Sequence, residues 1–240
     1  MSIFAITQKG TSKAENEDRI IIGQNLLAEG SIQTDYSSGI IAVADGVGGN
    51  NAGAVASHFI ALKLTSIDNL SQEAFLKIND DLLRLSKSHT DYSNMATTLS
   101  GIWFNEGIAV LFSVGNTRVF LLQSGKYLKQ LTSDDTTLNY LLATGQLTAE
   151  AAENFERKNE ITACFGGGAS HLCKIKCNPI EKPTSPFVMT SDGIHDFISV
   201  DQMEEIISTY GISLDACNAM IVAAREGGSY DDASVIIGEL

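Results

Sequence analysis

Apolar positions along the chain follow strand-like spacing first and helix-like spacing next. Three β-branched segments, each bounded by Gly, Asp or Ser, predict strands at Ile3–Thr7, Arg19–Leu27 and Gly39–Ala44. Apolar side chains then recur three or four residues apart, which predicts helices over Ala52–Ser66 and Gln72–Ser88.

Closely spaced strands dominate the middle of the chain. Turns of two or three residues that contain Gly or Asn separate them, so we expect an antiparallel meander. Its strands are predicted at Thr98–Phe104, Ile108–Val114, Arg118–Gln123 and Tyr127–Leu131.

Helices and strands are both predicted in the C-terminal half. Helical spacing occurs at Thr137–Ala143, Thr148–Arg157, Val200–Ser208 and Ser213–Glu226, and strands are expected near Leu172–Cys177, Phe187–Thr190 and Ala233–Gly238. Strands that cluster with strands, and helices that come in pairs, favour an α+β fold. Because each antiparallel sheet needs one face covered, we expect helix pairs outside packed sheets. We see no linker or repeat and expect one domain over residues 1–240.

Composition narrows the class of protein. The chain has 240 residues, of which 44% are apolar, and 29 acidic against 16 basic side chains give a net charge of −13. This charge disfavours nonspecific binding to nucleic acid or an anionic membrane. The N-terminal segment lacks the basic lead of a signal peptide, no apolar run is long enough to span a membrane, and four cysteines are too few for a secreted disulfide framework. We therefore expect a cytoplasmic protein.

Carboxylates stand at the ends of predicted strands. Asp18 precedes one strand, Asp45 and Asp192 each follow an apolar strand, and Asp231 opens the last one. Singly, each has an ordinary alternative, since Asp-Gly is a frequent turn dipeptide and Asp caps helices. A buried carboxylate is costly unless something neutralises it. Four such positions without a matching Lys or Arg cluster indicate a shared cation.

The type of ligand limits which cation this is. Oxygen donors without His or Cys at ligand spacing suit Mg²⁺ or Mn²⁺ rather than zinc or copper. A glycine after Asp45 lets the backbone approach closely, so the Gly46 carbonyl can also be a ligand. Two such ions about 3.5–4 Å apart can activate a water and steady a phosphoryl group. Hydrolysis of a phosphate ester is the reaction that gains most from this arrangement.

Seven segments, in one order and spacing, resemble the metal-dependent protein phosphatases of type 2C in their compact bacterial form. They are Gly10–Asp18, Val43–Gly49, Ala96–Leu99, Ser113–Arg118, Leu131–Asp134, Val188–Gly193 and Ser229–Ile236. The resemblance implies a four-layer αββα sandwich, with two packed antiparallel sheets flanked by helix pairs and a small flap at about residues 136–160. It also implies hydrolysis of phosphoserine and phosphothreonine in proteins that are targets of a bacterial serine/threonine kinase.

Site roles follow from the resemblance by position. Asp45 would bridge two Mn²⁺ or Mg²⁺ ions and Gly46 would offer its carbonyl to one of them. Asp192 and Asp231 would bind the other ion. Glu17 and Asp18 would hold metal-bound waters, and a metal-bridging hydroxide would attack phosphorus directly.

Departures from the family pattern concern four positions. Lys13 stands where the family usually has an Arg that binds the substrate phosphate. A lysine can neutralise the charge of the phosphate but cannot form the two parallel hydrogen bonds of an arginine. The alternative is that Lys13 is a solvated surface lysine. Asn116 replaces an Asp that binds a weaker third metal, which predicts low occupancy there, although a turn asparagine is the plainer alternative. Asp232 replaces an Asn and adds negative charge. Val47 stands where some members have a histidine.

Two other functions stay open. The chain could be a catalytically weakened phosphoprotein-binding regulatory module, which Lys13 and Asn116 suggest. It could also be a hydrolase of small phosphate esters on the same scaffold.

Overall fold

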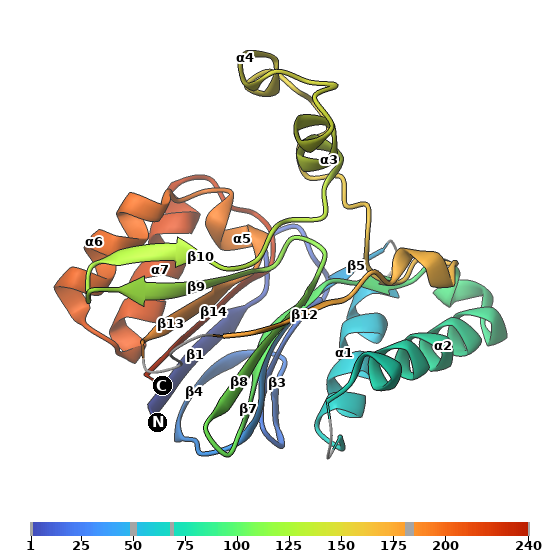
Figure 1. Cartoon of the computed structure of the whole chain (residues 1–240), viewed down its shortest axis with the longest axis horizontal. Helices are drawn as coiled ribbons and strands as arrows, with labels where there is room; N and C mark the ends of the chain where they lie inside the picture. Colours follow the sequence, from blue (N-terminus) through green and yellow to red (C-terminus); the bar gives the residue numbers. More distant parts are fainter. Residues whose placement is uncertain (1, 49–51, 68–69, 181–184, 240) are drawn as a thin grey trace.

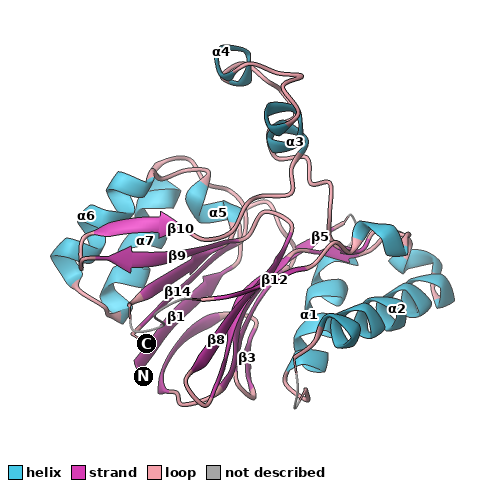
Figure 2. Ribbon diagram, in the orientation of Figure 1, coloured by secondary structure: helices cyan, strands magenta, loops and turns pink. Residues whose placement is uncertain are grey.

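Two antiparallel sheets face each other, and helices cover both outer surfaces (Figures 1 and 2). The computed structural model describes residues 2–48, 52–67, 70–180 and 185–239. In strand order, the first sheet contains β10 (Tyr127–Gln130), β9 (Arg118–Gln123), β13 (Phe187–Thr190), β14 (Ala233–Gly238), β1 (Ser2–Gln8) and β4 (Gly30–Asp35).

The second sheet is built around β5. Its main path contains β11 (Phe165–Gly166), β6 (Ala96–Thr97), β5 (Gly39–Val47), β7 (Leu99–Asn105), β8 (Ile108–Val114) and β12 (Lys176–Pro179). Beside this path, β2 (Asp18–Ile22) pairs with β5 and with β3 (Asn25–Leu27).

Helices lie in two groups on the outside of the sandwich (Figure 1). The second sheet carries α1 (Ala52–Leu64) and α2 (Gln72–Ser88), followed by a 3-10 turn, η1 (Thr90–Tyr92). The first sheet carries α5 (Asp192–His195), α6 (Val200–Tyr210) and α7 (Leu214–Glu226). A further 3-10 turn, η2 (Ser170–Leu172), precedes β12. Within the described residues, no helix has both the length and the apolarity needed to cross a bilayer.

Strand alternation explains the layers. In β2, Ile20 and Ile22 are buried between the two sheets, whereas Ile21 is buried against α1 and α2. In β14, Ile236 lies between the sheets and its neighbour Val235 lies under α6 and α7. Successive side chains of a strand point to opposite faces, so each central strand contributes to two apolar layers. Three apolar layers separate four layers of structure, and the predicted αββα sandwich is confirmed.

The predicted meander is wrong, because the chain changes sheet in its middle. Strands β7 and β8 pair in one sheet, and β9 and β10 pair in the other. The connection at Gly115, Asn116 and Thr117 is therefore a crossing rather than a hairpin. Gly115 adopts φ +95°, and the Thr117 hydroxyl donates to Ser100 Oγ at 2.9 Å across the two sheets. Such contacts between layers cannot be read from strand spacing.

Other element boundaries also differ from the prediction. The expected strand Arg19–Leu27 is a hairpin, β2 and β3, that turns at Gly23 with φ +59°. Edge strand β4 was not predicted, because it is polar and mostly exposed. The helix expected over Thr148–Arg157 is limited to α4 (Ala149–Ala152), and the strand near Leu172–Cys177 is β12.

A protruding segment stands away from the sandwich and carries α3 (Thr137–Ala143) and α4 (Figure 1). It lies in the range expected for the flap, residues 136–160. A bridge between Thr136 and Ile161 closes its base, and neither helix contains a buried residue. The segment is therefore joined to the body at its base.

Candidate active site

Four predicted carboxylates meet at one edge of the sandwich. Asp18 begins β2 and is the register partner of Asp45 in β5. Asp192 begins α5, with one residue between it and the end of β13, and Asp231 lies just before β14; these two strands are neighbours in the facing sheet. The charges of Asp192 and Asp231 act on Asp45, and the Asp192 carboxylate accepts a hydrogen bond from Asn116 Nδ2 at 3.1 Å. Both sheets thus deliver acidic groups to one place.

Asp18 is the most deeply buried of the four. Its side chain has no exposed surface, and its Oδ2 accepts hydrogen bonds from the hydroxyls of Ser191 and Ser234, each at 2.7 Å. Its Oδ1 is buried and has no hydrogen-bond partner among the described residues. A buried carboxylate oxygen without a partner costs free energy, which a cation or a cation-bound water would recover. Sequence reasoning missed both serines, because a serine next to a strand end carries no distinctive signal.

Burial and mutual repulsion disfavour ionisation of these groups. Burial raises the pKa of Asp18 to about 7, and the charges of Asp232 and Asp192 add to the effect. Burial, followed by Asp192 and Asp18, raises the pKa of Asp45 well above its ordinary value. The pKa of Asp192 is raised by burial and by Asp231. Divalent cations would reverse these directions by favouring the charged carboxylates.

Lys13 provides positive charge at the rim of the acidic cluster. Its Nζ lies 2.5 Å from Glu17 Oε2 and 3.5 Å from Asp231 Oδ1. Burial by itself would lower the pKa of Lys13, but the hydrogen bond to Glu17 and the charge of Asp231 outweigh it and raise the pKa. The Lys13 side chain is 31% exposed and paired with two carboxylates, so it is not a freely solvated surface lysine.

Tight backbone packing positions the Gly46 turn. The Gly46 amide donates to the Glu17 carbonyl at 3.1 Å, and a Cβ on Gly46 would lie 2.3 Å from the Gly53 carbonyl oxygen. A Cβ on Gly53, at the start of α1, would in turn lie 2.7 Å from Glu17 Oε1. Only glycine fits at either position. The role of Gly53 was not predicted, because it depends on the approach of α1 to β5.

Asp232 ties three segments together. Its two carboxylate oxygens accept from the amides of Gly10 and Glu17, each at 2.7 Å. The neighbouring Asp231 carbonyl accepts from Arg225 Nη1 at 2.6 Å. Asp232 was predicted only as an additional charge, whereas its contacts hold the loop that carries Glu17.

The donors fit hard divalent cations. Among the described residues, no three His, Cys, Asp or Glu side chains surround a single point where one ion could sit. Mg²⁺ commonly uses one or two protein carboxylates and keeps several waters, so it does not need such an enclosure. The single histidine in α5, His195, is buried, with Nδ1 2.8 Å from Thr190 Oγ1, and burial holds its pKa well below the ordinary value. Carboxylates and backbone carbonyls remain as the donor set.

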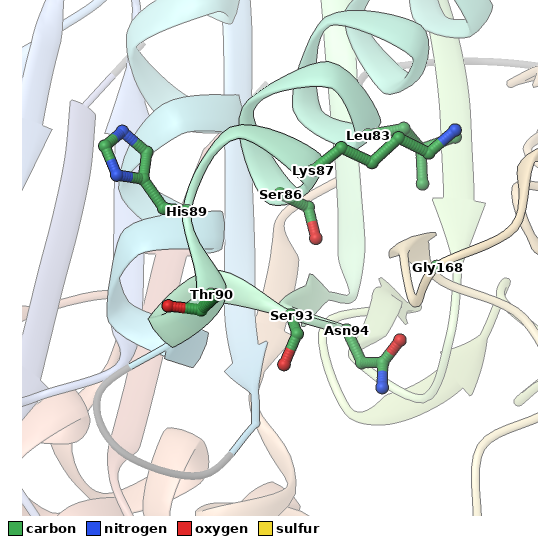
Figure 3. A pocket seen from close by; sticks show the side chains of 8 residues that line it. All are labelled: Leu83, Ser86, Lys87, His89, Thr90, Ser93, Asn94 and Gly168. Atoms are coloured by element: carbon green, nitrogen blue, oxygen red, sulfur yellow. The ribbon is translucent and has the colours of Figure 1, made fainter.

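A separate hollow lies at the C-terminal end of α2 and shares no residue with the acidic cluster (Figure 3). Its volume is about 320 Å³, and it is lined by residues of α2 and η1 and by Gly168. Figure 3 shows His89 and Lys87 pointing in different directions, so these two side chains do not converge on a common point.

Comparisons with known proteins agree with this geometry. A family model described as protein phosphatase 2C matches residues 23–223. A serine/threonine phosphatase of Listeria monocytogenes, Stp, is 28% identical over 97% of this chain and 93% of its own length. The crystal structure of the Mycobacterium tuberculosis serine/threonine phosphatase PstP matches with a TM-score of 0.83 at 24% identity, covering 100% of this chain and 99% of that one. A PstP catalytic domain in complex with two manganese ions matches with a TM-score of 0.75 at 23% identity, covering 100% and 99%.

Proposed function

The chain belongs to the protein phosphatase 2C family, and we propose on that premise that it hydrolyses phosphoserine and phosphothreonine in proteins at a dinuclear Mn²⁺ or Mg²⁺ centre. The juxtaposition of Asp18, Asp45 and Asp192, which come from both sheets, carries this proposal, and Asp18 Oδ1 is buried without a hydrogen-bond partner among the described residues. A PstP structure described with two manganese ions supports the metal.

Four residues at this edge would hold the two ions. Asp45 would contact both ions, with the Gly46 carbonyl on one of them, and Asp192 and Asp231 would hold the other. When bound, the ions supply an acidified water and neutralise charge on the phosphoryl group. Glu17 and Asp18 would orient water at the centre.

Lys13 would contribute to phosphate binding. Its protonated Nζ stands at the rim, where it would attract and orient the substrate phosphate. A lysine offers a point charge rather than a planar fork, so its contribution is mainly to affinity.

EDTA-sensitive, Mn²⁺-dependent release of phosphate from a phosphothreonine peptide tests the proposal. We expect turnover with Mn²⁺ and none with EDTA. Micromolar peptide binding without turnover would instead support the regulatory module. Equal kcat/KM for a free phosphorylated metabolite and the peptide would favour the small-ester hydrolase.

A further inference from the structure

A shallow apolar hollow of about 430 Å³ lies along the outer side of α1, next to the acidic cluster. Val55, Phe59 and Leu62 line it from α1, Leu85 lines it from α2, and Arg19 lines it from β2. Leu62 is 50% exposed, although the opposite side of α1 is already buried against the sheet. An apolar surface of this kind, in a hollow with polar residues at its rim, is typical of a binding groove.

Arg19 joins the hollow to the site. Its Nη1 donates to the backbone carbonyls of Asn16 and Asp18, at 2.6 and 2.7 Å. The residue is only 7% exposed, and its buried Nε has no hydrogen-bond partner among the described residues. The buried Nε is closed to a ligand, but Nη2 is not buried and forms no hydrogen bond within the described residues, so it can donate to a ligand in the hollow. This donor beside an apolar hollow favours a ligand that offers both an oxygen acceptor and an apolar side chain. A polypeptide segment has both.

The dimensions suit a short extended segment. The hollow begins near Ala54, one residue after Gly53, which packs on Gly46 and Glu17, and it extends to Leu62. Eight helical residues span about 12 Å. Roughly four residues of extended peptide cover the same length.

We propose that this hollow binds the part of a phosphoprotein substrate that flanks the phosphorylated residue. A bulky apolar side chain of the substrate would pack against Leu62, Phe59 and Val55, and a substrate backbone carbonyl would accept from Arg19. This inference rests on the proposed function, because the hollow has this role only if the adjacent carboxylates form the catalytic centre.

Leu62→Asp tests the inference, with Leu76→Asp as the matched control. Leu76 is 42% exposed on α2 and lies outside the hollow. The substrates are p-nitrophenyl phosphate and a set of phosphothreonine peptides in which one leucine is moved through an alanine background. For the best leucine-containing peptide, we expect Leu62→Asp to raise KM about tenfold, equivalent to about 1.4 kcal/mol. Its kcat, and all constants for p-nitrophenyl phosphate, should not change. Leu62→Met and Leu76→Asp should behave as the wild type.

Three results would overturn the inference. The first is an unchanged peptide KM in Leu62→Asp. The second is a rise in the KM of Leu62→Asp for p-nitrophenyl phosphate equal to its rise for the peptide. The third is a wild-type KM that does not depend on the position of leucine in the peptide. A change in oligomeric state without a change in KM would assign the hollow to a second copy of the chain. Failure of the proposed function is distinct, since the wild type would then fail to hydrolyse any of the phosphothreonine peptides efficiently, wherever the leucine stands.

Discussion

Asp18 and Asp45 face each other directly across the ladder between β2 and β5. Opposed residues of an antiparallel pair point to the same side of a sheet, with Cβ atoms about 4.5–5.5 Å apart. Two carboxylates in this relationship repel each other, and burial strengthens the effect. The fold therefore places acidic groups together at the cost of its own stability, which is expected where a cation completes the site.

Protonation of Asp18 should make the metal-free protein sensitive to pH. Its pKa is about 7 in the folded protein against an ordinary value of 3.8, so between these values the folded state holds a proton that the unfolded chain has released. Stability therefore falls as pH rises through this window. His195, whose pKa is lowered, acts in the opposite direction. Comparison with Asp18→Asn separates the two effects. In EDTA, the Tm of the wild type should fall relative to that variant from pH 5 to pH 8, and a relative rise would contradict the assignment.

Asp192→Asn should abolish metal-dependent hydrolysis. The change keeps the shape of the side chain but replaces the carboxylate that accepts from Asn116, and whose charge acts on Asp45, by a neutral amide. A bound metal ion would stabilise the charge of the transition state by several kcal/mol, so loss of its ligand should lower kcat/KM by at least about a hundredfold. Asp91→Asn, on exposed η1, is the control. Near-normal turnover in Asp192→Asn would refute its role.

Asn116→Asp should increase affinity for an additional Mn²⁺. The substitution removes the amide donor to Asp192 and adds a charge at a buried position. We expect a lower Tm in EDTA, a larger rise in Tm on addition of Mn²⁺, and a gain in calorimetric stoichiometry or affinity. Identical titrations for the two proteins would count against a third site.

Lys13→Arg should lower the KM for phosphopeptides severalfold, because an arginine can bind phosphate through two parallel hydrogen bonds. Lys13→Gln should raise KM about tenfold through loss of a charge-assisted hydrogen bond. Steady-state kinetics at saturating Mn²⁺ measures the KM of each variant and of the wild type. Equal KM values in all three proteins would show that residue 13 does not contact the phosphate.

Gly53→Ala should destabilise the protein and reduce turnover together. Its Cβ would contact both Gly46 and Glu17 at 2.7 Å, and overpacking of this kind costs about 1–3 kcal/mol. Denaturant unfolding and peptide kinetics measure the two effects. Gly107→Ala is a useful comparison, because no atom lies within 4 Å of its added Cβ. Any loss of stability in this variant arises only from the φ of +82° at this position.

Local sequence was sufficient to identify the candidate site residues and most of the elements that hold them. Consecutive β-branched and apolar residues in β2 and β5 predicted strands, and aspartates at the ends of such strands predicted a cation site. These signals lie within a few residues of one another, so periodicity and residue type are sufficient to find them.

Tertiary structure alone decided how those residues meet. The change of sheet at Gly115, the hydroxyl pair Ser191 and Ser234 on Asp18, and the contact of Gly53 with Gly46 each join segments that are far apart in the chain. No local spacing encodes the distance between two separate strands, because that distance is set by how the sheets and helices pack. The sequence therefore determined the types of the candidate ligands, and packing of the four layers determined how they are placed relative to one another.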